Sequence, residues 1–214
     1  AELVSVGSRT QSSASDFANA HGIAHAHPSY EALAQDPKVD VVYIATPHTQ
    51  HFKQLIAVAN AGKHVYCEKP WTLDYSEGRA ALEAFSKSNL KVAIGHNRRF
   101  APNSIAMKEA LDRGELGDPI HIDGHFNSNL VPAKGSWRDN PDESPAGGMT
   151  SMGIHVLDMF INLFGRISDV NVQSKRIASP IGVDDSTLVR GNFESGRTGH
   201  LTTVSATSML WRIS

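Results

Sequence analysis

The chain has 214 residues, of which 40% are hydrophobic and 20% are charged, and its formal net charge is -2. This length suits one domain or two modest ones, and the apolar content argues against a disordered chain. Basic residues are scattered, which argues against a nucleic-acid partner, and no apolar run approaches the roughly 20 residues of a membrane span. We therefore expect a soluble globular protein that binds neither nucleic acid nor a membrane.

Cys67 is the single cysteine, so the chain cannot form an internal disulfide. This favours a reducing compartment, and we expect a cytoplasmic protein, although many exported bacterial proteins also lack disulfides. The sequence opens on Ala1 and enters a strand-like run within two residues. We interpret this start as cut and expect a further segment upstream.

The first half alternates between strand-like and helix-like stretches. The predicted strands cover 3–6, 39–45, 64–67 and 92–95, and the predicted helices begin near residues 12 or 13, 29, 52 and 74. The run from Val39 to Ala45 is almost wholly apolar and rich in β-branched residues, which is typical of a strand covered on both faces. The alternation predicts a parallel sheet with helices on its faces over residues 1–97.

The second half, residues 98–214, follows a different plan. A helix is predicted over about 102–113, a strand over 120–126, a long loop over 127–148 and a helix over about 149–164. Three strand-like stretches then follow near 168–177, 184–193 and 198–206 without intervening helices. Successive strands of this kind predict an α+β domain with a mostly antiparallel open sheet.

Polar side chains follow each predicted strand of the first half. Because ligands bind outside the carboxyl ends of parallel strands, these residues form one candidate edge. They are Ser8-Arg9, Thr46-Pro47-His48, Glu68-Lys69-Pro70 and His96-Asn97-Arg98-Arg99.

Ser8 and Arg9 stand where a dinucleotide-binding domain usually has an acidic residue for the ribose 2′-hydroxyl. A hydroxyl and a guanidinium suit a 2′-phosphate, so the pair favours NADP over NAD. An ordinary solvated turn is the alternative for these two residues.

Lys69 is the sharpest candidate for proton transfer. It lies between Glu68, a possible partner, and Pro70, which restricts the backbone. A lysine whose pKa is lowered by burial serves as a general acid or base. On spacing alone, a surface turn is the alternative interpretation.

A second candidate stretch starts at Gly147-Gly148, where the absence of side chains would allow the backbone to approach a ligand closely. Ser151, His155 and Asp158 follow at i, i+4 and i+7 and so share one helix face. A packed core histidine is the alternative interpretation of His155.

The eleven histidines do not predict a metal site. His121 and His125 share a strand face but are roughly 13 Å apart at ~3.3 Å per residue, which is too far for one ion. His25 and His27 have no suitable third ligand nearby in sequence. Cys67 is next to a buried strand and an acidic residue, so we interpret it as packing and not as a nucleophile.

Several motifs together resemble the glucose-fructose oxidoreductase / inositol dehydrogenase (Gfo/Idh/MocA) family of NAD(P)-dependent oxidoreductases. They are VVYIATP at 41–47 with His51, AGKHVYCEKP at 61–70, GHNRRF at 95–100 and GIHVLD at 153–158. The resemblance covers essentially the whole chain, with the motifs in the order that the family has.

The resemblance implies a Rossmann-type domain followed by a substrate domain whose open sheet serves dimer or tetramer contacts. It implies that Lys69 and His155 act beside the nicotinamide, with Ser151 near them, and that the Lys69-Pro70 bond is cis. The residues expected to touch the cofactor are Ser8, Arg9, Thr46, Pro47, His48, His51, Glu68, Lys69, Asn97, Trp137 and Arg138. Those expected to touch the substrate are Lys69, Arg98, His155 and Asp158.

Three departures from the family pattern stand out. Ser151 replaces an aspartate four residues before the histidine, so the proton relay is altered. His48 replaces a commoner asparagine. The first strand and its Gly-x-Gly-x-x-Gly turn, which would hold the pyrophosphate, are absent from this sequence.

The expected activity is hydride transfer between NADP or NAD and a secondary alcohol of a sugar or cyclic polyol. One alternative is a non-catalytic, nucleotide-sensing regulatory protein on the same scaffold. Another is redox-assisted glycoside cleavage, and a third is that the fragment alone is inactive.

Overall fold

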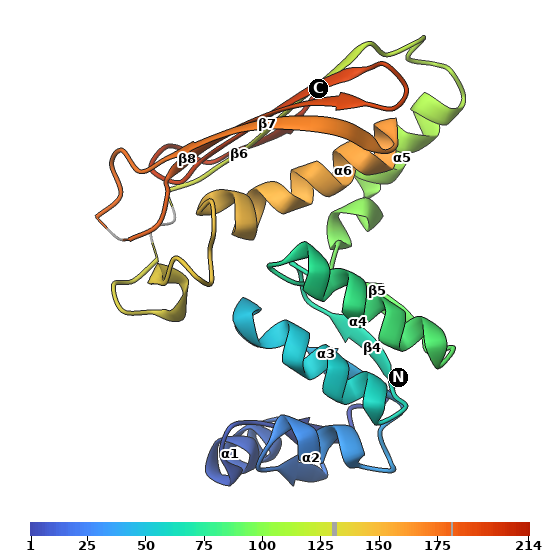
Figure 1. Ribbon diagram of the computed structural model, residues 1–214, viewed down its shortest axis with the longest axis vertical. Coiled ribbons are helices and arrows are strands. Elements are labelled where there is room, and N and C mark those ends of the chain that lie inside the picture. The colour runs from blue at the N-terminus through green and yellow to red at the C-terminus, as the bar shows by residue number, and fades with distance from the viewer. Residues whose placement is uncertain (130–131, 181) are drawn as a thin grey trace. The chain divides into compact units, whose positions relative to one another are not determined.

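The computed structural model describes residues 1–129, 132–180 and 182–214. They form two compact units, Ala1–Gly95 and His96–Ser214 (Figure 1). The sequence placed its domain boundary two residues later, after residue 97.

The first unit alternates strands and helices along its length. Its elements are β1 (Ser5–Gly7), α1 (Gln11–His21), β2 (His25–His27), α2 (Tyr30–Gln35), β3 (Val41–Ile44), a 3-10 turn (His48–Gln50), α3 (His51–Asn60), β4 (His64–Cys67), α4 (Tyr75–Lys87) and β5 (Val92–Ile94). Polar caps set the helix starts: the side chains of Thr10, Ser29 and Asp74 accept backbone N–H groups of the first turns of α1, α2 and α4. The short strand β2 was absent from the predicted set.

All strands of the first unit pair in parallel, in two separate sheets. One sheet contains β1 and β2, and the other has the order β3-β4-β5. The carboxyl ends of β3, β4 and β5 therefore lie at one edge, as the strand-end argument requires.

The core of the first unit covers one face of β3 and β4. Val42 and Ile44 are buried with the apolar residues of α2, α3 and α4, whereas Val41 and Tyr43 are 54% and 58% exposed. The prediction that this strand is covered on both faces is therefore wrong for residues 1–95. An almost continuous apolar run does not reveal that the helices pack on one side only.

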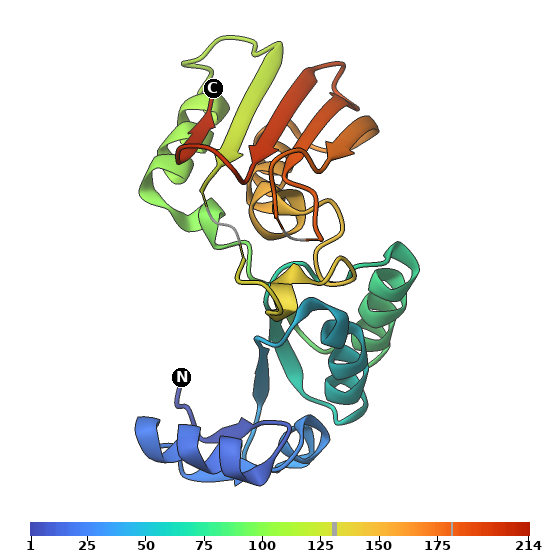
Figure 2. The same ribbon diagram turned by 90° about the vertical axis from the view of Figure 1, so that its left-hand side faces the viewer.

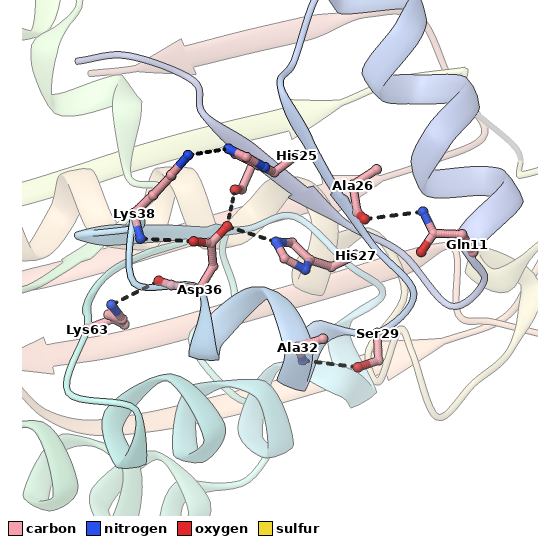
Figure 3. A network of polar contacts seen from close by, with 10 residues as sticks. Gln11, His25, Ala26, His27, Ser29, Ala32, Asp36, Lys38 and Lys63 are labelled. Carbon is pink, nitrogen blue, oxygen red and sulfur yellow. Dashed lines mark hydrogen bonds and ion pairs between the residues drawn. The ribbon is translucent and has the colours of Figure 1, made fainter.

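A polar network around Asp36 joins the elements at the start of the first unit (Figure 3). The Asp36 carboxylate accepts hydrogen bonds from Ser5 Oγ at 2.6 Å and the Lys38 backbone N–H at 2.9 Å, and it pairs with His27 Nε2 at 2.9 Å. Lys38 Nζ lies 3.0 Å from His25 Nε2. Since Ser5 and His25 begin their strands and Asp36 precedes β3, we interpret this network as structural.

The described residues of the second unit form two α-helices and a sheet. Its elements are a 3-10 turn (Asn97–Phe100), α5 (Pro102–Asp112), β6 (His121–Asn127), a 3-10 turn (Trp137–Asp139), a π-helical segment (Met149–Gly153), α6 (Ile154–Phe164), β7 (Ile167–Lys175), β8 (Ser186–Phe193), β9 (Thr198–Val204) and β10 (Leu210–Ile213). The predicted helix over about 149–164 is thus a π-helical turn followed by an α-helix. The strand β10 was not predicted.

The strands described in the second unit form one sheet of order β10-β6-β9-β8-β7 (Figure 2). Only β6 and β9 pair in parallel, and the other neighbours are antiparallel. The apolar stripe of α6 packs on one face of this sheet, where Val156, Met159 and Phe160 are buried. A side chain at Gly124 of β6 would lie 2.5 Å from Val156 Cγ1, so only glycine lets the helix approach this closely.

The predicted fold class is confirmed: a parallel Rossmann-like unit is followed by a unit with a mostly antiparallel sheet. Among the described residues, no helix combines the length and the hydropathy needed to cross a membrane.

Candidate active site

Lys69 and Pro70 form the turn that leaves β4, and the peptide bond between them is cis, as expected. Lys69 is half-buried. The ring of His51 lies behind this turn, with Nδ1 2.7 Å from the Pro70 carbonyl oxygen and Nε2 3.0 Å from the Thr46 carbonyl oxygen. His51 is fully buried, so its ring joins the ends of β3 and β4 and presents no surface of its own to the expected cofactor.

Thr46 and Gln54 meet where β3 ends. The Thr46 hydroxyl donates to Gln54 Oε1 at 2.9 Å. Gln54 Nε2 is buried and has no hydrogen-bond partner among the described residues, so this edge holds an unused polar group. His48, also buried, lies edge-on to His51 with ring centroids 5.8 Å apart. Neither Gln54 nor its orphaned amide was predicted, because a glutamine inside a helix carries no signal of its own.

Glu68 is held at the same edge by three strands. Its Oε1 accepts the Tyr43 hydroxyl at 2.9 Å and its Oε2 accepts the Lys69 backbone N–H at 3.3 Å. A side chain at Gly95 would lie 2.9 Å from Glu68 Oε2. Although Tyr43 is 58% exposed, partial desolvation, followed by the hydrogen bond to the Glu68 carboxylate, raises its pKa to about 12, so this phenol stays protonated at neutral pH.

Ser8 and Arg9 follow β1, as the sequence predicted. The Ser8 backbone N–H donates to the His27 carbonyl at 3.2 Å, and Arg9 is exposed. The guanidinium is therefore open to an anionic ligand at the carboxyl end of β1. These residues, with the strand ends and the orphaned amide of Gln54, fit the polar side of a dinucleotide.

In the second unit, His155 lies in an aromatic and cationic cluster. Its ring centroid is 6.5 Å from that of Phe126 in β6. The Arg98 guanidinium lies over the Phe126 ring at 6.0 Å and over the Trp211 ring at 4.8 Å. Arg98 and His155, both predicted as site residues, thus share Phe126 as a neighbour, while Phe126 and Trp211 were missed because their contacts join distant strands.

Asp158, which was predicted to contact substrate, forms an ion pair with Arg99. Arg99 Nε donates to Asp158 Oδ2 at 2.7 Å, and its Nη2 donates to Oδ1 at 2.6 Å. His96 Nδ1 is 3.8 Å from Asp158 Oδ2. Asp158 of α6 is 7% exposed, and through Arg99 its carboxylate anchors the 3-10 turn Asn97–Phe100 to α6. Asn97 in this turn is exposed. The hydrogen bond to Asp158 raises the pKa of Arg99.

Ser151 lies in the π-helical segment four residues before His155. Single π-helical turns inside helices are frequent at functional sites. A side chain at Gly153 would lie 2.7 Å from Thr203 Cγ2, and one at Gly148 would lie 2.7 Å from Ser205 Oγ. Because Gly148 and Gly153 have no side chains, the π-helical segment can pack closely against β9 and Ser205.

Trp137 and Arg138 form a 3-10 turn in the long loop, with the Arg138 guanidinium 4.0 Å from the Trp137 ring centroid. Leu130 and Val131, also in this loop, lie outside the described residues.

The part of the chain that the structure describes supports neither a metal site nor thiol chemistry. Across residues 1–129, 132–180 and 182–214, no three His, Cys, Asp or Glu side chains are grouped so that they could hold a metal ion. Cys67 is fully buried, and this burial raises the pKa of its thiol to about 12. A thiol of this kind is a poor nucleophile, as expected from the sequence.

Both units match one enzyme family. Residues 1–96 match the oxidoreductase family with an NAD-binding Rossmann fold, and residues 105–212 match the GFO/IDH/MocA C-terminal domain. Oxidoreductase P35 of Formosa agariphila is 35% identical over 173 residues, which are 78% of this chain and 54% of that protein. Trans-1,2-dihydrobenzene-1,2-diol dehydrogenase of Bos taurus is 32% identical over 201 residues, 94% of this chain and 59% of that protein.

Solved structures share the fold. A putative NADPH-dependent oxidoreductase from Desulfitobacterium hafniense superposes with a TM-score of 0.91 at 27% identity, over 99% of this chain and 62% of that one. Levoglucosan dehydrogenase in complex with NADH and levoglucosan has a TM-score of 0.91 at 24% identity, over 99% of this chain and 60% of that one. The chain thus spans between half and two thirds of the length of these relatives. It belongs to the Gfo/Idh/MocA family of oxidoreductases.

Proposed function

We propose that this chain carries the catalytic residues of an NAD(P)-dependent dehydrogenase that oxidises a secondary alcohol of a sugar or cyclic polyol. The observation that carries the proposal is the Lys69 turn: a half-buried ammonium at the carboxyl end of a parallel strand, in a cis Lys-Pro turn backed by a buried histidine. Membership of an oxidoreductase family whose first domain binds NAD supports it.

Lys69 and His155 are the proton-handling groups of this proposal. When the nicotinamide cofactor is bound, it accepts the hydride. Negative charge builds on the substrate oxygen as the hydride leaves. An ammonium that donates a hydrogen bond to this oxygen, or a neutral amine or imidazole that takes the hydroxyl proton, therefore lowers the barrier. Ser151 hydrogen-bonds in the place of a carboxylate, and Arg98 orients the hydroxyl-rich substrate.

The cofactor is NADP in this proposal, with NAD as the competitor. The exposed guanidinium of Arg9 beside Ser8 supports a 2′-phosphate, because arginine binds phosphate in a bidentate manner. Relatives include both a putative NADPH-dependent oxidoreductase and an enzyme solved with NADH. The predictions of a cytoplasmic location and of a homodimer or homotetramer stay predictions.

The decisive experiment tests a panel of sugars and inositols with NAD and NADP on the full-length gene product, meaning the longest chain that the gene encodes. In that protein, Lys69→Ala should lower kcat by about 100-fold or more, within the range typical of acid–base groups, while the Kd of reduced cofactor changes less than about twofold. Lys87→Ala is the matched control, because Lys87 is an exposed lysine whose ion pair is with the exposed Glu83. Near-normal turnover of Lys69→Ala would remove the assignment.

Two alternatives are separated by the same assays. Cofactor binding without turnover of any alcohol in the panel would favour a nucleotide-sensing protein. Release of an aglycone with no net reduced cofactor would favour redox-assisted glycoside cleavage.

A further inference from the structure

The turn between β7 and β8, by which we mean residues 176–180 and 182–185, is organised by one buried carboxylate. Asp185 is 4% exposed, and its oxygens accept backbone N–H groups of Ile177 at 3.0 Å and Ala178 at 2.6 Å, as well as that of Ser179. Burial alone would raise the pKa of Asp185, but these N–H groups together lower it below its usual value. The carboxylate is therefore ionised at neutral pH and acts as a fixed acceptor.

The backbone of Asp185 ties this turn to two strands. Its N–H donates to the Lys175 carbonyl at 3.1 Å, and its carbonyl accepts the Ser205 N–H at 2.9 Å. Asp185 thus fixes the geometry of the turn and its position at the ends of β7 and β9.

The β7–β8 turn also holds the long loop that carries Trp137 and Arg138. The Asp139 carboxylate accepts the Gly135 N–H at 2.8 Å within the loop and the Gly182 N–H at 3.2 Å from the turn. One side chain therefore closes the loop on itself and attaches it to the turn.

A second attachment lies at the end of the loop, directly before the π-helical segment. Ser174 Oγ donates to Asp184 Oδ2 at 2.6 Å and lies 2.7 Å from Thr187 Oγ1, which is 3.2 Å from the Ala146 carbonyl. The two hydroxyl groups have one proton each, so only two of these three contacts can be hydrogen bonds at one time. Thr187 is 1% exposed, so its hydroxyl is shielded from water.

Gly147 makes the tightest approach. Its φ is +53°, and a side chain there would overlap the carbonyl group of Asp184. The backbone of the loop is therefore pressed against the backbone of the turn one residue before Asp185. From this point the chain enters the segment with Ser151 and reaches His155 within eight residues.

We propose that Asp185 is a positioning residue for the dehydrogenase reaction: it shapes the β7–β8 turn, and the turn holds the loop and the π-helical segment in register for Ser151 and His155. The inference rests on the proposed function and deepens it. Catalytic geometry is sensitive to small displacements, since a misplacement of about 1 Å costs on the order of 100-fold in rate. Asp185 itself touches neither cofactor nor substrate in this proposal.

The test uses the full-length gene product with its best alcohol substrate. Asp185→Ala should lower kcat at least about tenfold, while the Kd of reduced cofactor, from fluorescence titration, changes less than about twofold. Asp185→Asn keeps one acceptor oxygen and should recover part of the loss. Asp169→Asn is the control, because Asp169 is an exposed carboxylate of β7 that accepts hydrogen bonds from the Asn192 amide.

Two further variants can also refute the proposal. If Asp185→Ala does not fold, Thr187→Val replaces it, because valine is nearly isosteric with threonine. This variant loses the hydroxyl contact with the Ala146 carbonyl and should lower kcat about threefold to tenfold. Folded Asp185→Asn and Thr187→Val variants with kcat within twofold of the parent would overturn the inference. So would a loss of cofactor affinity equal to the loss of kcat, because that indicates general damage.

Hydrogen exchange separates this inference from the proposed function. In Asp185→Asn, amides of residues 134–153 should exchange at least about fivefold faster, whereas those of α5 and β6 should keep the parent rates. If the parent oxidises no alcohol but this pattern appears, the dehydrogenase proposal fails, and the ordering of residues 134–153 by Asp185 stands without a catalytic role. Unchanged exchange in 134–153 would remove the positioning role whatever the activity.

Discussion

The ion pair between Arg99 and Asp158 gives a sharp prediction for stability. Asp158 is 7% exposed and receives two hydrogen bonds from the Arg99 guanidinium, at 2.6 Å and 2.7 Å. Replacing Arg99 with alanine leaves a buried carboxylate without its main partner. Such losses cost about 3–5 kcal/mol in fully buried pairs. Because the Arg99 side chain is 36% exposed and water reaches it, we expect about 2–3 kcal/mol for Arg99→Ala.

Arg166 provides the matched control in the same unit. Its Nε lies 3.0 Å from Glu194 Oε1, but the two side chains are 84% and 57% exposed. Exposed pairs contribute about 0–1 kcal/mol, so Arg166→Ala should change the free energy of unfolding by less than about 1 kcal/mol. The two variants remove the same kind of side chain and differ mainly in the burial of its partner.

The assay is urea unfolding followed by circular dichroism and tryptophan fluorescence. The second unit contains Trp137 and Trp211, and the first contains Trp71, so fluorescence reports on both units. Adding Asp158→Asn to Arg99→Ala should recover part of the lost free energy, because it removes the unpaired charge. Equal losses for Arg99→Ala and Arg166→Ala, or no recovery in the double variant, would refute the reasoning.

Two further predictions concern the first unit. The hydrogen bonds from Ser5 and Lys38 and the contact with His27 lower the pKa of Asp36 from its usual value of 3.8, so the ionised form stabilises the fold above that pH and this contribution is lost as the pH falls further. Asp36→Asn should therefore destabilise the protein at pH 7, and the gap to the parent in urea unfolding should shrink below about pH 4; a gap that widens on acidification would contradict this. Since burial raises the pKa of Cys67 to about 12, a thiol reagent should modify the native protein at least about 100-fold more slowly than the unfolded chain, and comparable rates would show that the thiol is accessible.

Local sequence patterns predicted most of the scaffold because the physics there is local. The run 39–45 and the capping pattern at Asp74 and Glu77 mark elements whose ends are set by neighbouring residues. The strand β10 was missed because four residues carry little signal, and its pairing with β6 joins segments about 85 residues apart. The π-helical turn was missed because its packing against Thr203 is a tertiary contact.

The candidate site divides in the same way. Motifs predicted Lys69, His155 and Arg98 as site residues, because the ends of strands and a helix face follow from chain order. Their partners were not accessible to the same reasoning: the Phe126 ring reaches both His155 and Arg98 from another strand. For His51 the motif gave the position but not the role, since only the fold shows that both ring nitrogens face backbone carbonyls.

The glycines show how a sequence interpretation changes when contacts are known. We interpreted Gly147 and Gly148 as leaving room for a ligand. In the structure the space is taken by the protein, because a side chain at Gly147 would overlap the Asp184 carbonyl and one at Gly148 would lie 2.7 Å from Ser205 Oγ. Gly95 is used in the same way against Glu68. A glycine beside a catalytic residue therefore points first to the element that it packs against, and here that element leads to Asp185, 30 residues beyond His155 in the chain.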